Sequence, residues 1–242
     1  MTRAPDRHAT VLDRIGPEIT AGTRPVGSVL TLEGIGTEYG VSRSVAREAV
    51  RVLESMGLVA SRRRVGVTVQ PRDGWHLFDP RVIVWRLEGV DRARQLVSLA
   101  ELRRGIEPEA AALAAERASA EQCRALATAV SDMVMTGRQG DLAAYLSADQ
   151  LFHHTLLEAS GNDMFAALSG LVAEALEGRT HHHLMPSQPN SEAIDLHDEV
   201  ARAVRHGDAA SAERAMRAII DEAAAAVRSQ FGPEAELEAG PA

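Results

Sequence analysis

Apolar residues recur with a helical period over most of the chain, and short runs typical of strands occur only before residue 70. Residues 8–21 carry apolar side chains at positions i, i+1, i+4 and i+8, which predicts an amphipathic helix. A short second helix is expected near residues 32–39. After a turn at Gly40, Ser42 is a suitable N-cap for a third helix that ends at Gly57.

The third predicted helix separates cations from apolar residues. On a helical wheel of about 100° per residue, the side chains of Arg43, Arg47 and Arg51 span about 80°. The apolar residues fall between about 180° and 280° from Arg43; they are Val45, Ala49, Val52, Leu53 and Met56. One side can therefore pack on its own domain while the other meets a polyanion. A helix, a tight turn and a cation-bearing helix form the layout of a major-groove reader.

Two short runs of strand-forming residues, 58–60 and 65–69, flank the basic stretch Ser61-Arg62-Arg63-Arg64. They predict a hairpin whose basic loop lies on DNA phosphates, which is called a wing. A single arginine cluster more often forms a solvated surface than a binding site. Here the arginine helix, the turn and the basic hairpin occur in the order of a winged helix-turn-helix. We therefore expect a DNA-binding domain over residues 1–72.

The rest of the chain predicts a mainly α protein. From residue 91 onward the sequence is Ala-rich and helical, and Ser119-Ala120-Glu121-Gln122 has the pattern of a capping box. We expect about six helices over residues 91–231. Residues 73–90 hold both tryptophans and lack the composition of a flexible linker, so a packed linker is expected there. Residues 232–242 are expected to form a flexible tail.

The charge of the chain is divided unevenly between these parts. The whole chain carries a net charge of −8, whereas residues 1–72 hold 11 Arg against 7 acidic residues. A basic part attached to an acidic part suits a DNA-binding domain joined to a soluble second domain. The reason is that neutralisation of phosphates dominates affinity for DNA. There is no apolar run of 18 residues, no secretion signal and one cysteine, Cys123. We expect a cytoplasmic protein without a membrane segment, in which Cys123 packs rather than reacts.

The motifs together resemble the GntR family of bacterial repressors, in its FadR-like branch. In the N-terminal part the resemblance rests on Gly40-Val41-Ser42-Arg43, Val45-Ala46-Arg47-Glu48-Ala49-Val50, Leu53, Gly57-Leu58-Val59 and Gly66. In the C-terminal part it rests on Glu101-Leu102-Arg103, Ile106-Glu107-Pro108, Asp149-Gln150-Leu151-Phe152-His153, Ala159-Ser160-Gly161-Asn162 and His197, which is similar to the branch's FCD ligand-binding domain. The resemblance covers nearly the whole chain.

The resemblance implies a set of DNA contacts. Arg43 and Arg47 would contact operator DNA, Ser44 would bind phosphates, and the loop at Gly66 would reach toward the minor groove. Family members often carry Arg after a Glu in the second helix, but here the sequence is Glu33-Gly34-Ile35. That departure removes one expected phosphate contact, so affinity depends more on Arg62, Arg63 and Arg64.

The resemblance also implies a divalent metal, such as Zn, Ni or Mn, beneath the effector. Asp149 and His153 occupy positions i and i+4, so both side chains project from one face of a helix toward one ion. His197 matches the third ligand, but the position of the fourth holds Ile219, which cannot bind a metal. Three alternatives remain: a three-ligand site, recruitment of a histidine from His181-His182-His183, or a metal-free pocket in which Asp149, His153 and His197 hydrogen-bond the effector.

Arg103 is expected to face the core of the helical domain, because it is spaced helically from Leu96, Leu99 and Ile106. A buried arginine needs an anion. Either Glu107 pairs with it or the carboxylate of an effector does, and the resemblance favours the effector. Residues 75–85 are similar to sugar-acid-responsive regulators, and a sugar acid offers a carboxylate and hydroxyls for Arg103 and a metal.

These observations predict a ligand-responsive repressor that binds a pseudo-palindromic operator as a homodimer. A metal-dependent hydrolase using Asp149, His153 and His197 is the alternative. It leaves the basic N-terminal part unexplained, and the sequence has neither a HExxH motif nor a nucleophile elbow. A DNA-binding structural protein without an effector is a third hypothesis, which an empty core without a pocket would favour.

Overall fold

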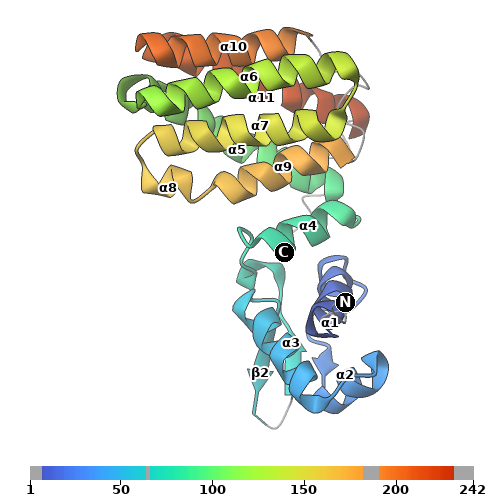
Figure 1. Cartoon of the computed structure of the whole chain (residues 1–242). Coiled ribbons are helices and arrows are strands. Elements are labelled where there is room, and N and C mark those ends of the chain that lie inside the picture. Colours follow the sequence, from blue (N-terminus) through green and yellow to red (C-terminus); the bar gives the residue numbers. More distant parts are fainter. Residues whose placement is uncertain (1–6, 64–65, 182–190, 232–242) are drawn as a thin grey trace, which may run out of the picture. The chain divides into compact units, whose positions relative to one another are not determined.

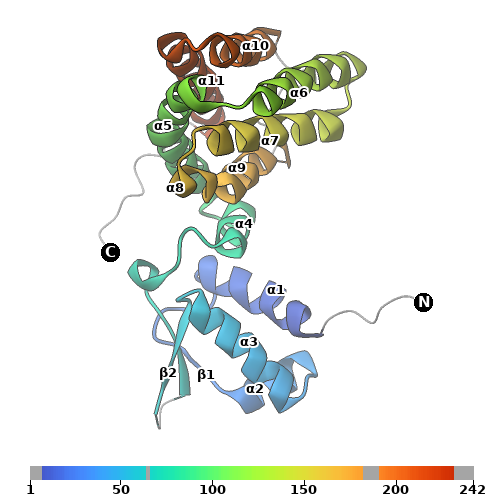
Figure 2. The ribbon, with the colours of Figure 1, turned by 60° about the vertical axis from the view of Figure 1, so that its left-hand side comes forward.

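The computed structural model describes residues 7–63, 66–181 and 191–231, and the chain separates into two compact units, residues 1–92 and 93–242. Figures 1 and 2 show the two units as ribbons. The N-terminal unit is a small mixed domain, and the C-terminal unit is formed by helices throughout its described residues. The mainly α fold predicted from the sequence is thus confirmed.

The N-terminal unit has the predicted order of three helices followed by a hairpin. Its elements are α1 (Arg7–Thr20), β1 (Val29–Leu30), α2 (Leu32–Tyr39), α3 (Arg43–Ser55), β2 (Val59–Arg62), β3 (Gly66–Val69), a 3₁₀ turn η1 (Arg72–Gly74) and α4 (Pro80–Glu88). The sheet is antiparallel in the order β1-β3-β2. The two-residue strand β1 was not predicted, because it is too short to show any alternation.

Capping residues fix the turn between α2 and α3. Gly40 ends α2 in the left-handed conformation with φ 64°, which a glycine adopts without steric penalty. The Ser42 hydroxyl then accepts a hydrogen bond from the Val45 backbone N–H and opens α3, as the sequence predicts. These caps hold the first turn of α3, where Arg43 lies, in a defined direction.

Helix α4 packs within the N-terminal unit. Asp79 caps α4 and Pro80 occupies its first turn, a combination that favours helix initiation. Trp85 is buried in the same hydrophobic core as Val11, Leu12 and Leu53. A Cβ atom at Gly16 of α1 would lie 2.3 Å from the Trp85 ring, so glycine is required for this contact.

The C-terminal unit is a helical bundle with α7 in contact with both α6 and α9 (Figure 1). Its helices are α5 (Arg92–Arg117), α6 (Ala120–Gln139), α7 (Leu142–Ala159), α8 (Asp163–Ala166), α9 (Ser169–His181), α10 (Ser191–His206) and α11 (Ala209–Phe231). The capping box at Ser119 and Gln122 is present. Small alanines fill much of the core, which allows close helix packing. No helix in the described part of the chain combines the length and apolarity needed to cross a membrane.

Candidate functional site

The arginines of α3 lie on its exposed face, opposite a buried face. Arg43, Arg47 and Arg51 are all exposed, and Arg51 forms an ion pair with Glu48 at 3.3 Å. The buried face, however, is rotated by about 50° on the helical wheel from the predicted one. The buried residues are Ala46, Ala49, Val50, Leu53 and Met56, whereas Val45 and Val52 are only half-buried. The reason is that α3 packs against both α1 and α2, which together cover a wider arc than one partner would.

Arginines from α3 and from the hairpin border the same surface hollow. Arg43 lines it from the start of α3, and Arg62 and Arg63 line it from β2 and the residue that follows. Glu33 of α2 lies on the same hollow and places a negative charge among these cations. Ser44 is exposed beside Arg43, Gly66 begins β3 with φ 116°, and Arg64 lies outside the described residues.

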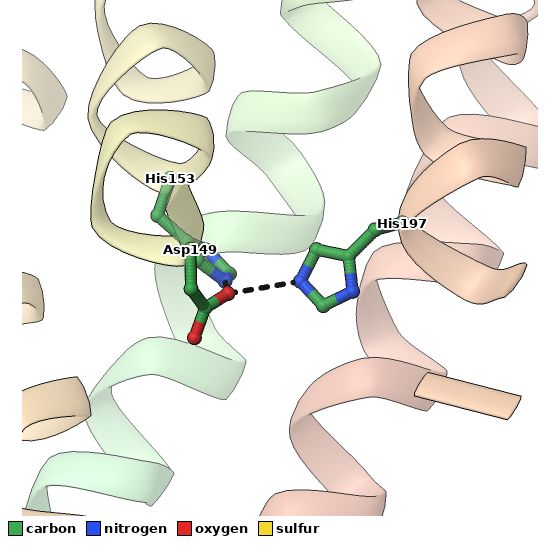
Figure 3. A group of neighbouring side chains, drawn as sticks. All are labelled: Asp149, His153 and His197. Carbon is green, nitrogen blue, oxygen red and sulfur yellow. Dashed lines mark ion pairs between the residues drawn. The ribbon is translucent and has the colours of Figure 1, made fainter. Parts of the chain in front are cut away.

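The sequence-predicted ligands Asp149, His153 and His197 converge in the C-terminal unit (Figure 3). Asp149 and His153 come from one face of α7, and His197 comes from α10. One potential ligand atom from each lies within 4.8 Å of the others, and all three side chains are buried. The Asp149 Oδ1 atom lies 3.2 Å from His197 Nε2 and 3.5 Å from His153 Nε2.

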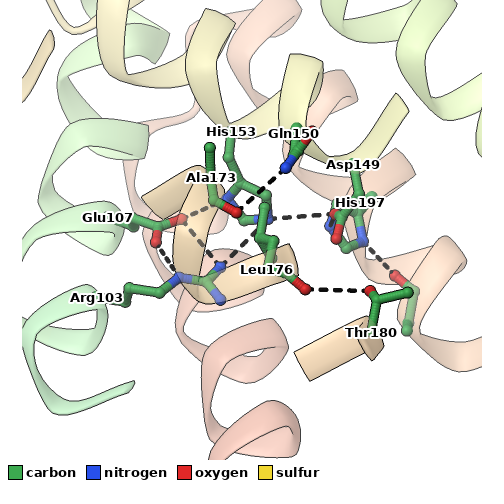
Figure 4. A network of polar contacts seen from close by, with 10 residues as sticks. Arg103, Glu107, Asp149, Gln150, His153, Ala173, Leu176, Thr180 and His197 are labelled. Carbon is green, nitrogen blue, oxygen red and sulfur yellow. Dashed lines mark hydrogen bonds and ion pairs between the residues drawn. The ribbon is translucent and has the colours of Figure 1, made fainter. Parts of the chain in front are cut away.

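Hydrogen bonds outside this cluster fix the orientation of both imidazole rings (Figure 4). His197 Nδ1 lies 2.6 Å from the backbone carbonyl oxygen of Ala193, and His153 Nδ1 contacts the carboxylate of Glu107. A carbonyl and a carboxylate can only accept, so each Nδ1 carries the proton and donates it. In the neutral rings, each Nε2 atom therefore carries a lone pair. The Nε2 of His197 faces Asp149, and the Nε2 of His153 lies near both Asp149 and the Arg103 guanidinium. This is the arrangement that outer-shell groups impose on metal-binding histidines.

Two atoms of the cluster have no hydrogen-bond partner. Asp149 Oδ1 and His197 Nε2 are enclosed and lack a partner among the residues that the structure describes. Burial by itself raises the pKa of Asp149, but His153 and His197 reverse this and hold that pKa well below its usual value. An ionised carboxylate that faces imidazole lone pairs in a buried site requires a cation, either a proton or a metal ion.

Arg103 pairs with Glu107, one of the two partners that the sequence left open. Arg103 Nε donates to the Glu107 carboxylate at 2.5 Å, and Arg103 Nη2 lies 3.4 Å from His153 Nε2 (Figure 4). Burial would raise the pKa of Glu107, but the charges of Arg103 and His153 lower it to about 2. Glu107 is therefore a carboxylate, and it links Arg103 to the histidine cluster.

The position that the resemblance assigns to a fourth metal ligand holds an apolar side chain. Ile219 of α11 is buried in the hydrophobic core and offers no donor atom. Among the described residues, Asp149, His153 and His197 form the only group of three or more His, Cys, Asp or Glu side chains that could hold a metal ion. His182 and His183 lie outside the described residues, as does the side chain of His181.

A small cavity adjoins this network between α5, α9 and α11. Its walls are aliphatic except for two arginines, Arg103 and Arg179. Arg179 was not predicted from the sequence, because it belongs to no motif and helix α9 has no amphipathic pattern that would orient it.

Each of the two units matches the model of a known protein family. Residues 7–69 match the model described as "Bacterial regulatory proteins, gntR family", and residues 98–222 match the model of the FCD domain. The cluster Asp149, His153 and His197 thus falls entirely within the FCD match, and the arginine face of α3 falls within the other.

Named relatives cover most of the chain. The galactonate operon transcriptional repressor of Escherichia coli (strain K12) is 28% identical over 85% of this chain and 90% of its own length. A probable D-xylose utilization operon transcriptional repressor of Paenarthrobacter nicotinovorans is 27% identical over 85% and 82%, respectively. A solved GntR structure from Streptococcus agalactiae is 26% identical, with a TM-score of 0.50 over 92% of this chain and 99% of that one. The chain therefore belongs to the GntR family of bacterial transcriptional regulators and carries a C-terminal FCD domain.

Proposed function

We propose that this regulator is a repressor whose FCD domain binds a small carboxylate, of the sugar-acid class, at a divalent metal held by Asp149, His153 and His197. The observation that carries the proposal is the convergence of three buried ligand atoms, two of which have no hydrogen-bond partner among the described residues. Two imidazoles and a carboxylate suit Zn²⁺, Ni²⁺ or Mn²⁺. A three-ligand site leaves coordination positions open for the effector.

The effector class follows from the chemistry of the site and from the names of relatives. A metal bound there would supply a Lewis acid that polarises and anchors the oxygen atoms of the effector. Arg103 lines the adjoining cavity and can orient a carboxylate. Two relatives are named as repressors of a galactonate operon and of a D-xylose utilization operon, which directs the choice of sugar acids as test compounds.

In this proposal, a homodimer binds the DNA. The exposed Arg43 and Arg47 of one N-terminal unit would enter a major groove, and Arg62 and Arg63 would contact phosphates beside it. Two copies would read two half-sites of a pseudo-palindromic operator. For regulation, the effector must bind with different affinities to the DNA-competent and DNA-incompetent states.

The test is release of operator DNA, measured by fluorescence anisotropy with the promoter region of the chain's own gene. Galactonate, gluconate and xylonate are added to the zinc-loaded protein, with galactose, glucose and xylose as neutral controls. We expect at least one acid to weaken operator binding and its neutral sugar to have no effect. The proposal fails if the zinc-loaded protein shows no preference for the promoter over random DNA at matched salt.

The matched relatives are named transcriptional regulators, so the hydrolase alternative has no support. Asp149, His153 and His197 are better explained as ligand-binding residues of the FCD domain than as a hydrolytic centre.

Glu107 provides a test of how the histidine cluster is oriented. The Glu107→Gln substitution keeps the shape of the side chain but removes the charge that fixes the proton on His153 Nδ1. Loss of such an outer-shell carboxylate typically weakens metal affinity by about 10–100-fold. Zinc affinity measured by competition with a chelator should fall by that factor in the variant. An exposed control, Glu109→Gln on the same helix, should bind zinc as the wild type does.

The pH dependence of stability should have opposite signs with and without metal. Burial lowers the pKa of His153, but the Glu107 carboxylate outweighs it and raises that pKa above its usual value. A raised pKa in the folded state contributes stability that is complete below about pH 6.5 and is lost as the pH rises through the folded value. The melting temperature of the EDTA-treated protein should therefore fall on going from pH 6 to pH 9.

Metal binding requires a deprotonated His153, so stabilisation by one equivalent of zinc should grow over the same pH range. Thermal unfolding of both forms across the series checks this prediction. A metal-free melting temperature that rises with pH in this window would show that the cluster is not as described.

A further inference from the structure

Arg179 belongs to the C-terminal unit but is not one of the proposed metal ligands. It lies on α9, two residues before that helix ends, and shares a cavity with Arg103. The other walls are aliphatic side chains, namely Leu96, Leu99, Ala100, Ala175, Ile220, Ala223 and Val227. Two cations in an otherwise apolar cavity are unusual, because an unpaired buried charge is expensive.

The two arginines differ in how their charges are satisfied. Arg103 is held by the Glu107 carboxylate through contacts from Nε and Nη2. Arg179 Nε, in contrast, is enclosed and has no hydrogen-bond partner in the part of the chain that is described. Burial and the neighbouring charge of Arg103 lower the pKa of Arg179, although Asp149, Glu222 and Tyr145 act in the opposite direction.

The balance of buried charges also indicates an anionic partner. Arg103 and Arg179 are accompanied by three carboxylates, Glu107, Asp149 and Glu222, so these five groups together carry one negative charge. A divalent cation on Asp149, His153 and His197 would make the region positive by one charge. In an interior of low polarity that positive excess favours the binding of an anion.

We propose that Arg179 binds an oxyanion group of the effector, a carboxylate or a phosphate, and thereby restricts the effector to acids. This inference rests on the proposed function, because it assigns the charge of the ligand in the same domain. The cavity has a volume of about 10 Å³, enough for one water molecule, so the anion must displace part of its wall. The Arg179 side chain is only partly buried and has a flexible stem, which allows it to withdraw.

The first test is the stability of the full-length Arg179→Met variant in a chloride buffer without organic acids. Methionine fills the volume of the arginine stem and removes both the charge and the enclosed Nε that has no partner among the described residues. A site built for an absent anion should gain stability, and we expect the melting temperature to rise by about 2–4 °C. A fall would show that Arg179 is a structural partner of Glu222, and an unchanged value would show that its charge is already satisfied; both overturn the proposal.

The second test adds compounds to the zinc-loaded wild type and the variant. Gluconate and galactonate probe a carboxylate, glucose 6-phosphate probes a phosphate, and glucose and galactose are uncharged controls. At least one acid should raise the melting temperature of the wild type, and the Arg179→Met variant should lose that shift. The proposal is overturned if the shift survives in the variant, if neutral sugars act equally, or if no acid acts on the wild type.

The Arg228→Met variant, on the exposed surface of α11, serves as the matched control and should respond to acids as the wild type does. Zinc content and promoter binding are measured on the same samples. When Arg179→Met keeps both and also keeps the acid shift, only the assignment of Arg179 fails. When the wild type itself holds no zinc and does not recognise its promoter, the proposed function fails.

Discussion

We expect the Asp149→Asn variant to lose zinc affinity by more than the roughly 100-fold upper value for outer-shell substitutions. Asp149 supplies the only charged ligand atom of the cluster, and its Oδ1 faces both Nε2 atoms at 3.2 and 3.5 Å. The asparagine amide can donate a hydrogen bond to an Nε2 lone pair and so remove the need for a cation. The metal-free variant should therefore be at least as stable as the metal-free wild type, while zinc no longer raises its melting temperature.

The matched control for this experiment is Asp198→Asn. Asp198 follows His197 directly on α10, but its side chain is half-exposed and pairs with Arg202 at 3.0 Å. Zinc titration monitored by calorimetry should give wild-type affinity for this control. Wild-type zinc affinity in Asp149→Asn would mean that the ion, if one binds, is held elsewhere.

The second large effect is expected on operator DNA. Replacing Arg47 with methionine removes the guanidinium group from the exposed face of α3 while leaving an unbranched side chain that suits a helix. Loss of a bidentate contact to a base typically costs about 1–3 kcal/mol, so operator affinity should fall roughly 5–150-fold. Arg51→Met should have a smaller effect, because Arg51 already pairs with Glu48.

Binding to random DNA separates base recognition from phosphate contact. If Arg47 reads a base, the variant should lose operator affinity much more than non-specific affinity. The control is Arg205→Met, an exposed arginine on α10 of the other unit, which should bind both DNAs normally. An Arg47→Met variant within twofold of the wild type on the operator would remove α3 from the DNA interface.

The parts of the fold that depend on local patterns were predictable from the sequence. The N-cap at Ser42, the glycine stop at Gly40 and the capping box at Ser119 are local chemistry, and the structure confirms each of them. The separation of arginines from apolar residues on α3 was also evident. The exact buried arc was not, because the burial of Ala46 and Val50 depends on how α1 and α2 pack around α3.

The same distinction between local patterns and packing applies to the functional cluster. The four-residue spacing of Asp149 and His153 places both on one helix face, but bringing in His197 required the resemblance to a family. The acceptors that orient the two rings, Glu107 and the Ala193 carbonyl, arise from packing between helices and within α10. Arg179 has no sequence signal, since the property that distinguishes it is an enclosed Nε without a partner.

The most direct test of the account is the metal content of the untagged, full-length protein after purification in chelator-free buffer. Elemental analysis should find about one zinc, nickel or manganese ion per chain, and EDTA treatment should remove it together with a measurable part of the thermal stability. Protein that contains no such metal and gains no stability from added zinc would contradict the assignment of Asp149, His153 and His197 as ligands.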